Sequence, residues 1–162
     1  PLCLPRSVVA IPQWPSRSRA LQWISYVQYS YRLPSEIFFL AINLLDRFAA
    51  GCQQIANLNG AHWDVLGIAC LWLAWKYESY NSLPRTEEII AHSEFRLTRS
   101  QLISAEWTVR NTIGLDLSYS SPITFARLKL VSCNRKRETA YVARFLAEIL
   151  TTVRQLVCCQ PA

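Results

Sequence analysis

The segment from Val65 to Tyr77, VLGIACLWLAWKY, constrains the fold more than any other part of the chain. It is apolar on every helical face until Lys76, and a helix of that kind is either buried in a protein core or spans a membrane. A membrane span needs about 20 apolar residues, whereas this run is shorter and is followed by Glu78 and a polar segment. We therefore expect the buried central helix of a helical domain and no membrane segment, with the long side chain of Lys76 reaching from the helix end to the surface.

The composition favours a globular, all-α protein. The chain has 162 residues, enough for one domain or for one domain and part of another, and 51% of them are hydrophobic, which excludes a disordered chain. Only 4 residues are glycine, and strand-like alternation joined by turn dipeptides is missing. Because the sequence contains no methionine, even at position 1, we expect a fragment, a processed form or an incomplete gene product.

The charged and metal-binding side chains indicate neither a catalytic nor a metal site. The net charge of +6 is concentrated before residue 36 and after residue 116; such basic ends suit nucleic acid or acidic partners, but a solvated, arginine-rich surface is the simpler interpretation. No two cysteines have the C-x-x-C spacing of a zinc or redox site. The two histidines, His62 and His92, are not placed near a pair of cysteines either. We expect no cofactor, a small core residue at Cys70, and a reducing compartment, the nucleus and cytoplasm.

Apolar spacing and capping residues predict the helices. After a Pro-rich arm over 1–15, we expect residues 16–117 to form a five-helix bundle with the third helix inside, and residues 118–162 to begin a second helical unit. The fifth helix opens with the capping box Thr98-x-x-Gln101, and the sixth with Ser121-Pro122. The expected helices cover about 16–31, 35–50, 60–78, 86–92, 98–113, a segment from 121 onward, and 138–157. The last one has an apolar stripe that needs a partner surface: Tyr141, Val142, Phe145, Leu146, Ile149 and Val153.

Several segments follow one another along the chain in a specific order: Trp23–Ile24, Phe39–Phe48, Leu66–Glu78, Leu102–Glu106 with Ile113–Leu117, and Leu117–Phe125. Together they resemble the cyclin box, the N-terminal cyclin fold, and are most similar to B-type (mitotic) cyclins, especially fungal ones. Each segment alone is a weak signal, but the ordered set is specific, and the resemblance covers about residues 16–157. It implies an all-α cyclin fold followed by the first helices of an incomplete second one.

The resemblance also implies roles for individual residues. The arginine six positions before the tryptophan in the family falls on Arg17, and the aspartate of the Leu-Asp-Arg-Phe turn falls on Asp46; in cyclins these two form an ion pair between the first two helices. The lysine and glutamate that contact the kinase fall on Lys76 and Glu106. In cyclins they project toward one face and bond to main-chain groups around the regulatory helix of the kinase.

Other positions around that face remain open or depart from the family pattern. Candidates for apolar contact with the kinase are Phe38, Leu45, Tyr77, Ile103 and Trp107, but the sequence does not show which of them face outward. The substrate-docking patch of the family begins with Met-Arg-x-Ile-Leu, whereas this chain has Ser-Arg-Ser-Arg-Ala at 16–20. Trp23 is the remnant of that patch, and Trp63 and Asp64 stand where leucine and glutamine are common.

The leading hypothesis is a non-catalytic regulatory subunit that binds and activates a cyclin-dependent serine/threonine protein kinase in cell-cycle control. The alternative is a nucleic-acid-binding or transcription-factor module, because cyclin-like folds also occur in general transcription factors and the chain contains the basic cluster Arg135-Lys136-Arg137. An enzyme is disfavoured, since no glycine-rich phosphate loop, metal-spaced ligands or nucleophile–base motif is present. We expect no small-molecule substrate.

Overall fold

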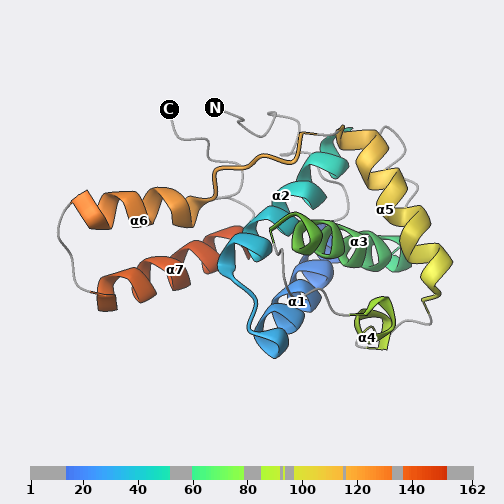
Figure 1. Cartoon of the computed structure of the whole chain (residues 1–162), viewed down its shortest axis with the longest axis horizontal. Coiled ribbons are helices and arrows are strands. Elements are labelled where there is room, and N and C mark those ends of the chain that lie inside the picture. The colour runs from blue at the N-terminus through green and yellow to red at the C-terminus, as the bar shows by residue number, and fades with distance from the viewer. Residues whose placement is uncertain are drawn as a thin grey trace.

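The computed structural model describes residues 14–51, 60–78, 85–91, 93, 97–114, 116–132 and 137–152. Every regular element in these ranges is an α-helix, which confirms the predicted fold class. Figure 1 shows α1 to α5 gathered into a bundle, from which α6 and α7 extend together to one side. The helices are α1 (Trp14–Tyr31), α2 (Ser35–Gly51), α3 (Gly60–Glu78), α4 (Thr86–Ala91), α5 (Arg99–Ile113), α6 (Pro122–Ser132) and α7 (Arg137–Thr152).

The predicted helix boundaries are close to the observed ones, with a difference at the start of α1. This helix begins at Trp14 rather than near Ser16, because a proline such as Pro15 is tolerated in the first turn of a helix, where no intrahelical partner awaits its backbone nitrogen. Residues 1–13 of the expected arm, and residues 153–157 expected to finish the last helix, lie outside the described ranges. The division of the chain near residue 117 stays a prediction.

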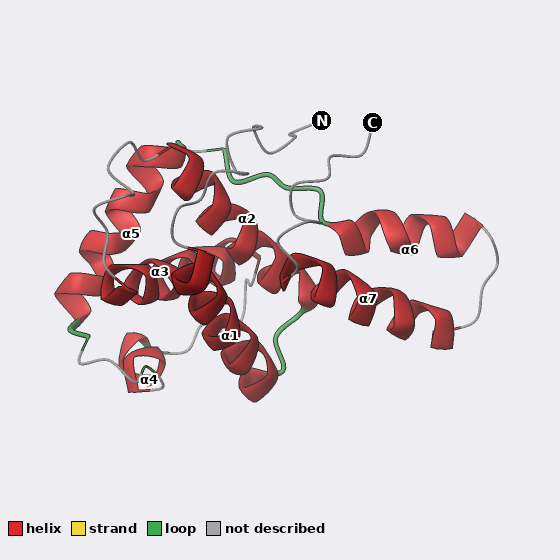
Figure 2. Cartoon of the chain, turned by 180° about the vertical axis from the view of Figure 1, so that it is seen from behind, coloured by secondary structure: helices red, strands yellow, loops and turns green. Residues whose placement is uncertain are grey.

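Helix α3 is the centre of the bundle, as its composition predicted. Helices α1, α2 and α5 all pack against it (Figure 2). From Trp63 to Trp75 its residues are buried, apart from the half-buried Val65, and the chain reaches solvent only from Lys76 onward. Cys70 is a buried free thiol in this helix, in agreement with its predicted place in the core.

Helix α2 is buried on nearly all sides. The apolar residues at helical spacing, Ile37, Leu40, Ala41, Leu44, Leu45 and Phe48, are buried, but so are Phe38, Phe39, Asn43 and Asp46. The reason is that α2 packs against α1, α3 and α5 and is also reached by α6. A charged residue such as Asp46 therefore needs a partner inside the protein.

A close crossing holds α1 against α3. A Cβ atom placed on Gly67 would lie only 3.0 Å from the Cβ atom of Ala20, so the two helices approach closely because both residues are small. The consequence is that the small side chain of Ala20 is matched to the glycine opposite it.

Local hydrogen bonds define both ends of α5, which carries part of the candidate site. The backbone N–H of Gln101 donates to Oγ1 of Thr98 at 3.3 Å, and the backbone N–H of Thr98 donates to Oε1 of Gln101 at 2.9 Å, which is the predicted capping box. At the other end, Gly114 adopts φ 81° and donates its N–H to the carbonyl of Arg110. Arg47 on α2 donates to the carbonyl of Ile113 at 3.2 Å, so the C-terminus of α5 is fixed to α2.

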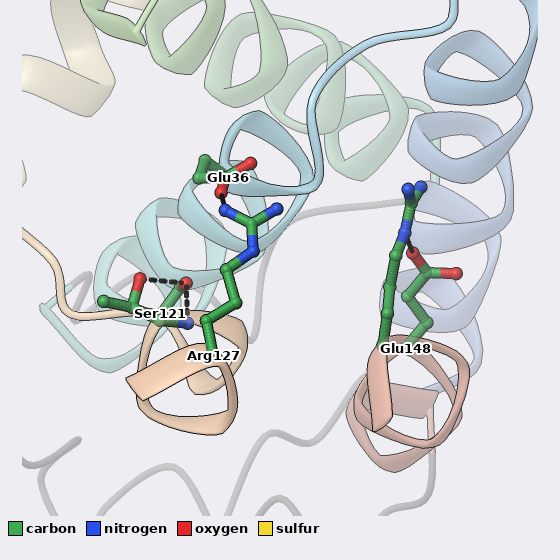
Figure 3. Close-up of polar contacts among 6 residues, drawn as sticks. Glu36, Ser121, Arg127 and Glu148 are labelled. Carbon is green, nitrogen blue, oxygen red and sulfur yellow. Dashed lines mark hydrogen bonds and ion pairs between the residues drawn. The ribbon is translucent and has the colours of Figure 1, made fainter. Parts of the chain in front are cut away.

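Helices α6 and α7 form a hairpin that contacts the bundle through both apolar and polar residues. Ile123 of α6 and Ala147 of α7 are buried and belong to the hydrophobic core. Ser121 caps α6, accepting the N–H of Thr124 at 3.2 Å, as the Ser-Pro pair predicted. Figure 3 shows Arg127 of α6 paired with Glu36 of α2. The same view shows Glu148 on α7, which accepts a hydrogen bond from Arg144 one turn earlier at 2.8 Å.

Candidate functional site

The structure brings Lys76 and Glu106 together on the surface of the bundle. Lys76 lies in the last turn of α3, where a cation favours the helix dipole, and Glu106 lies in the middle of α5. The Nζ atom of Lys76 donates to Oε1 of Glu106, and it also lies 5.5 Å from the centre of the Trp72 ring. A third of the Lys76 side chain is exposed but only 11% of the Glu106 side chain, so the pair sits at the edge of the core and within reach of a partner.

Exposed apolar side chains surround this ion pair. Tyr77, Ile103 and Trp107 are 49%, 51% and 61% exposed, respectively. Ile103 precedes Glu106 by three positions and Trp107 by four, which places all three on one face of α5. Phe38 and Leu45, the other apolar candidates, are buried in the core and cannot contact a partner. We refer to Lys76, Tyr77, Ile103, Glu106 and Trp107 as the α3–α5 surface.

The α3–α5 surface has the chemical character of a protein-binding site. Exposed aromatic and aliphatic groups provide area that a partner can bury, and tryptophan is among the residues enriched at energetic centres of interfaces. The ammonium of Lys76 only donates hydrogen bonds, and the carboxylate of Glu106 only accepts them. The pair can therefore exchange its mutual bond for bonds to a carbonyl and an N–H of a partner backbone, so that each charged group keeps a hydrogen bond.

Arg17 and Asp46 form a second ion pair, which is buried. The Nε atom of Arg17 donates to Oδ1 of Asp46 at 2.6 Å and its Nη2 atom donates to Oδ2 at 2.8 Å, a bidentate arrangement between α1 and α2. Arg17 is completely buried. Its Nη1 atom donates to the backbone carbonyl of Thr151, near the end of α7, at 3.2 Å. One guanidinium thus joins three helices, including the hairpin helix.

The buried carboxylate of Asp46 influences two nearby acids. Burial raises the pKa of the Cys70 thiol far above its ordinary value, and the negative charge of Asp46 raises it further. Burial also raises the pKa of Tyr119 to about 12, with a further contribution from Asp46. Both groups are therefore neutral at physiological pH, and Cys70 is not a reactive thiolate.

Trp23 lies half-buried on α1, close in sequence to an unexpected ion pair. The Nε atom of Arg19 donates to Oδ1 of Asp64 at 2.9 Å, and the Nη2 atom of Arg19 contacts Oδ2. The Asp64 side chain is nearly buried, whereas about half of the Arg19 side chain is exposed. Two positions that depart from the expected apolar docking patch therefore compensate each other, because the charge introduced at one is paired with the charge introduced at the other.

The described residues offer no metal site and no membrane-spanning helix. Within the described ranges, no three His, Cys, Asp or Glu side chains are grouped so that they could hold a metal ion. In the same part of the chain, no helix is both long enough and apolar enough to cross a membrane. The basic cluster considered for nucleic acid falls on Arg135 and Lys136, which lie outside the described residues, and on Arg137, whose side chain is not described.

Residues 6–118 match the family model of the cyclin N-terminal domain. The chain belongs to the cyclin family. Its matched part contains α1 to α5, and with them the whole α3–α5 surface and the ion pairs Arg17–Asp46, Arg19–Asp64 and Lys76–Glu106.

Individual cyclins similar to this one include G2/mitotic-specific cyclins of two fungi and a B2-type cyclin of a plant. The chain is 29% identical to the G2/mitotic-specific cyclin-3 of Saccharomyces cerevisiae over 150 residues, which are 93% of this chain and 34% of that protein. It is 29% identical to cyclin-B2-4 of Arabidopsis thaliana over 82% of this chain and 30% of that protein. For the G2/mitotic-specific cyclin cdc13 of Schizosaccharomyces pombe the identity is 28%, over 84% and 27%. The chain thus spans about a third of the length of these relatives.

Two features of this cyclin could not be found from its sequence. The contact between Lys76 and Glu106 joins side chains 30 positions apart, and their residue types alone indicate two separate surface charges. The pair between Arg19 and Asp64 spans 45 positions and has no local signal. The resemblance to cyclins does offer a signal for this second pair. Arg19 and Asp64 both replace uncharged residues at positions that are expected to lie in the same surface patch.

Proposed function

We propose that this chain is a non-catalytic regulatory subunit that binds and activates a cyclin-dependent protein kinase in cell-cycle control, through the α3–α5 surface. One observation carries the proposal: the ion pair of Lys76 and Glu106 stands at the surface within a group of exposed apolar side chains. Membership in the cyclin family and similarity to mitotic cyclins support it. The kinase, its activation and its substrates are all part of the proposal, because the chain spans only a third of its relatives.

The chain would act by binding, with phosphoryl transfer left to the kinase. A regulator that binds the active arrangement of its kinase more tightly than the inactive one shifts the population toward the active state. In a protein kinase that arrangement includes an ion pair between a lysine and a glutamate of the regulatory helix. Lys76 would donate to a main-chain carbonyl near that helix and Glu106 would accept a main-chain N–H, while Tyr77, Ile103 and Trp107 bury apolar area beside them.

The test is capture and activation of a mitotic-type cyclin-dependent kinase by the purified chain. We expect the wild type to bind the kinase and to stimulate phosphorylation of a histone substrate. The double variant Lys76→Ala/Glu106→Ala should bind at least tenfold more weakly, because charge-assisted hydrogen bonds are among the stronger polar contacts.

A matched control is available on the far side of the molecule. Arg144 and Glu148 form a comparable, partly exposed ion pair on α7, and Arg144→Ala/Glu148→Ala should leave kinase binding unchanged. A folded wild-type chain that captures no such kinase would refute the proposed function. Equal losses in the two double variants would refute the assignment of the α3–α5 surface.

We also propose that the protein resides in the nucleus and cytoplasm, where a cyclin-dependent kinase would meet it. Fluorescence microscopy of the tagged chain tests this; a signal confined to a membrane-bound secretory compartment would contradict it.

A further inference from the structure

Arg110 continues the face of α5 that carries the candidate site. Four residues of this helix stand at positions i, i+3, i+4 and i+7 and therefore share one face: Ile103, Glu106, Trp107 and Arg110. The Cζ atom of Arg110 lies 6.0 Å from the centre of the Trp107 ring. A guanidinium at this distance from an aromatic ring is attracted to it by a cation–π interaction, so the half-buried side chain of Arg110 borders the α3–α5 surface.

The charge of Arg110 is not balanced as the other charges of α5 are. Glu106 is bonded to Lys76, and Arg99 is paired with Glu87 at 3.5 Å. Within the described ranges no carboxylate forms an ion pair with Arg110, and none of its nitrogen atoms is buried without a partner. Because Lys76 and Glu106 neutralise each other, Arg110 adds one uncompensated positive charge at the edge of the α3–α5 surface.

The C-terminal end of α3 does not supply the missing acid. Glu78 ends that helix two positions after Lys76. Burial raises the pKa of the Glu78 carboxyl, and the negative charge of Glu36 on α2 raises it further, so Glu78 is near the start of α2. Neither is paired with Arg110 in the part of the chain that the structure describes. A binding partner is therefore the source of an acid for Arg110.

A partner that covers Trp107 would bring Arg110 into the interface as well, because the two side chains lie next to each other. A guanidinium that is covered without an acid is strongly unfavourable, whereas one that is covered together with a carboxylate gains two parallel charge-assisted hydrogen bonds. The five N–H donors of arginine form a planar fork that matches a carboxylate. The contact with Trp107 restricts this fork before binding, so less freedom is lost when the carboxylate arrives.

We propose that Arg110 binds an acidic side chain of the kinase, and that it thereby selects kinases that carry an aspartate or a glutamate at the opposing position. This inference rests on the proposed function, because it names one further contact of the same surface. A kinase with a neutral or basic residue at that position would leave Arg110 unpaired or repelled, which is how an interface discriminates against a wrong partner. Lys76 and Glu106 would contact main-chain groups, which all kinases share, and cannot make this distinction.

The test is the affinity of the purified chain for a mitotic-type cyclin-dependent kinase, measured by isothermal titration calorimetry at two salt concentrations. At about 0.1 M NaCl, Arg110→Gln should bind at least about fivefold more weakly than the wild type, and at about 0.5 M the difference should shrink because salt screens partly exposed charges. Arg110→Lys keeps the charge but not the planar fork, so its affinity should lie between the two. Arg32→Gln is the matched control, since Arg32 is an exposed arginine between α1 and α2 that also has no ion pair within the described residues. Its replacement should leave the affinity unchanged.

Chemical modification of the wild type provides a second measurement, which does not depend on the folding of any variant. Phenylglyoxal reacts with exposed guanidinium groups, and mass spectrometry locates the modified residues. In the complex with the kinase Arg110 should be protected, whereas Arg32 should react as it does in the free chain.

Failure of this inference can be told apart from failure of the proposed function. If the wild type binds the kinase and Arg110→Gln binds it equally well, or if Arg110 stays reactive in the complex, the role of Arg110 is overturned and kinase binding stands. An equal loss in Arg32→Gln, or a loss that is the same at both salt concentrations, would also overturn it, since neither is expected of a local ion pair. A folded wild-type chain that captures no such kinase would refute the proposed function itself, and the role of Arg110 with it.

Discussion

Removal of one partner from the buried pair of Arg17 and Asp46 should destabilise the protein severely. Replacement of Arg17 by methionine retains much of the apolar volume but deletes the bonds of 2.6 and 2.8 Å to Asp46. The Asp46 side chain is only 3% exposed, so its carboxylate would be left without compensation inside the core. Breaking a buried pair in this way costs about 3–5 kcal/mol, a large part of the roughly 5–15 kcal/mol that stabilises a typical domain.

The assay is urea unfolding at neutral pH, followed by circular dichroism. Arg17→Met and Asp46→Leu should each lower the free energy of unfolding by about 3–5 kcal/mol, while the double variant should lose less than either single variant because no charge is stranded. Arg17→Lys is the control for geometry: it keeps the charge but loses the bidentate contact and the bond to the carbonyl of Thr151 at 3.2 Å. It should fall between the wild type and Arg17→Met.

A loss of less than about 1 kcal/mol in each single variant, which is the range of exposed ion pairs, would show that no buried charge is stranded. Strictly additive losses in the double variant would show that Arg17 and Asp46 do not interact, since two residues that interact should show a coupling energy of about 0.5–3 kcal/mol.

Three further predictions follow from the packing and the titration of single residues. Because the pKa of the Cys70 thiol is raised in the folded protein, near and above pH 9 only the unfolded chain releases this proton. The free energy of unfolding should therefore fall by up to about 1.4 kcal/mol per pH unit in that range. In urea unfolding at several pH values, Cys70→Ala should show a flatter pH dependence than the wild type, and equal slopes would contradict the prediction. Gly67→Ala should destabilise the protein by about 1–3 kcal/mol although alanine has the better helix propensity, because the added Cβ atom would lie 3.0 Å from the Cβ atom of Ala20. Thermal unfolding measures this change. A more stable variant would show that α1 and α3 can move apart without cost. Thr98→Ala should lower the free energy of unfolding by about 1 kcal/mol through loss of the α5 cap. The nearby control Ser100→Ala should change it little. Equal losses of the two variants in urea unfolding would count against the role of the cap.

Features encoded by neighbouring residues could be predicted from the sequence. The start of α5 follows from Thr98 and Gln101, whose side chains and backbone groups satisfy each other over three positions. The burial of α3 follows from its composition, since no face of the helix between Trp63 and Trp75 is polar enough to remain in water. Asp64 is the charged residue in this stretch, and it is paired with Arg19. The places of Arg17, Asp46, Lys76 and Glu106 on these helices came from the resemblance to cyclins, and their roles toward a kinase stay predictions.

Features that depend on how helices are arranged around one another could not be predicted. Phe38 and Ile103 are both apolar residues on amphipathic helices, yet one is buried because α2 is covered on nearly all sides, and the other is exposed because α5 lies at the periphery. The compensation of Arg19 by Asp64 depends on the crossing of α1 and α3. Direct pairing of Lys76 with Glu106 likewise depends on the distance between α3 and α5.

The central claim, that the α3–α5 surface binds a cyclin-dependent kinase, is tested most directly by the affinity of two single variants. Trp107 on α5 and Tyr26 on α1 are 61% and 58% exposed, so truncation of either to alanine should leave the fold intact. Measured by isothermal titration calorimetry with a mitotic-type kinase, Trp107→Ala should weaken binding at least tenfold, or about 1.4 kcal/mol, and Tyr26→Ala by less than twofold. Unchanged affinity in Trp107→Ala, or an equal loss in Tyr26→Ala, would contradict the account.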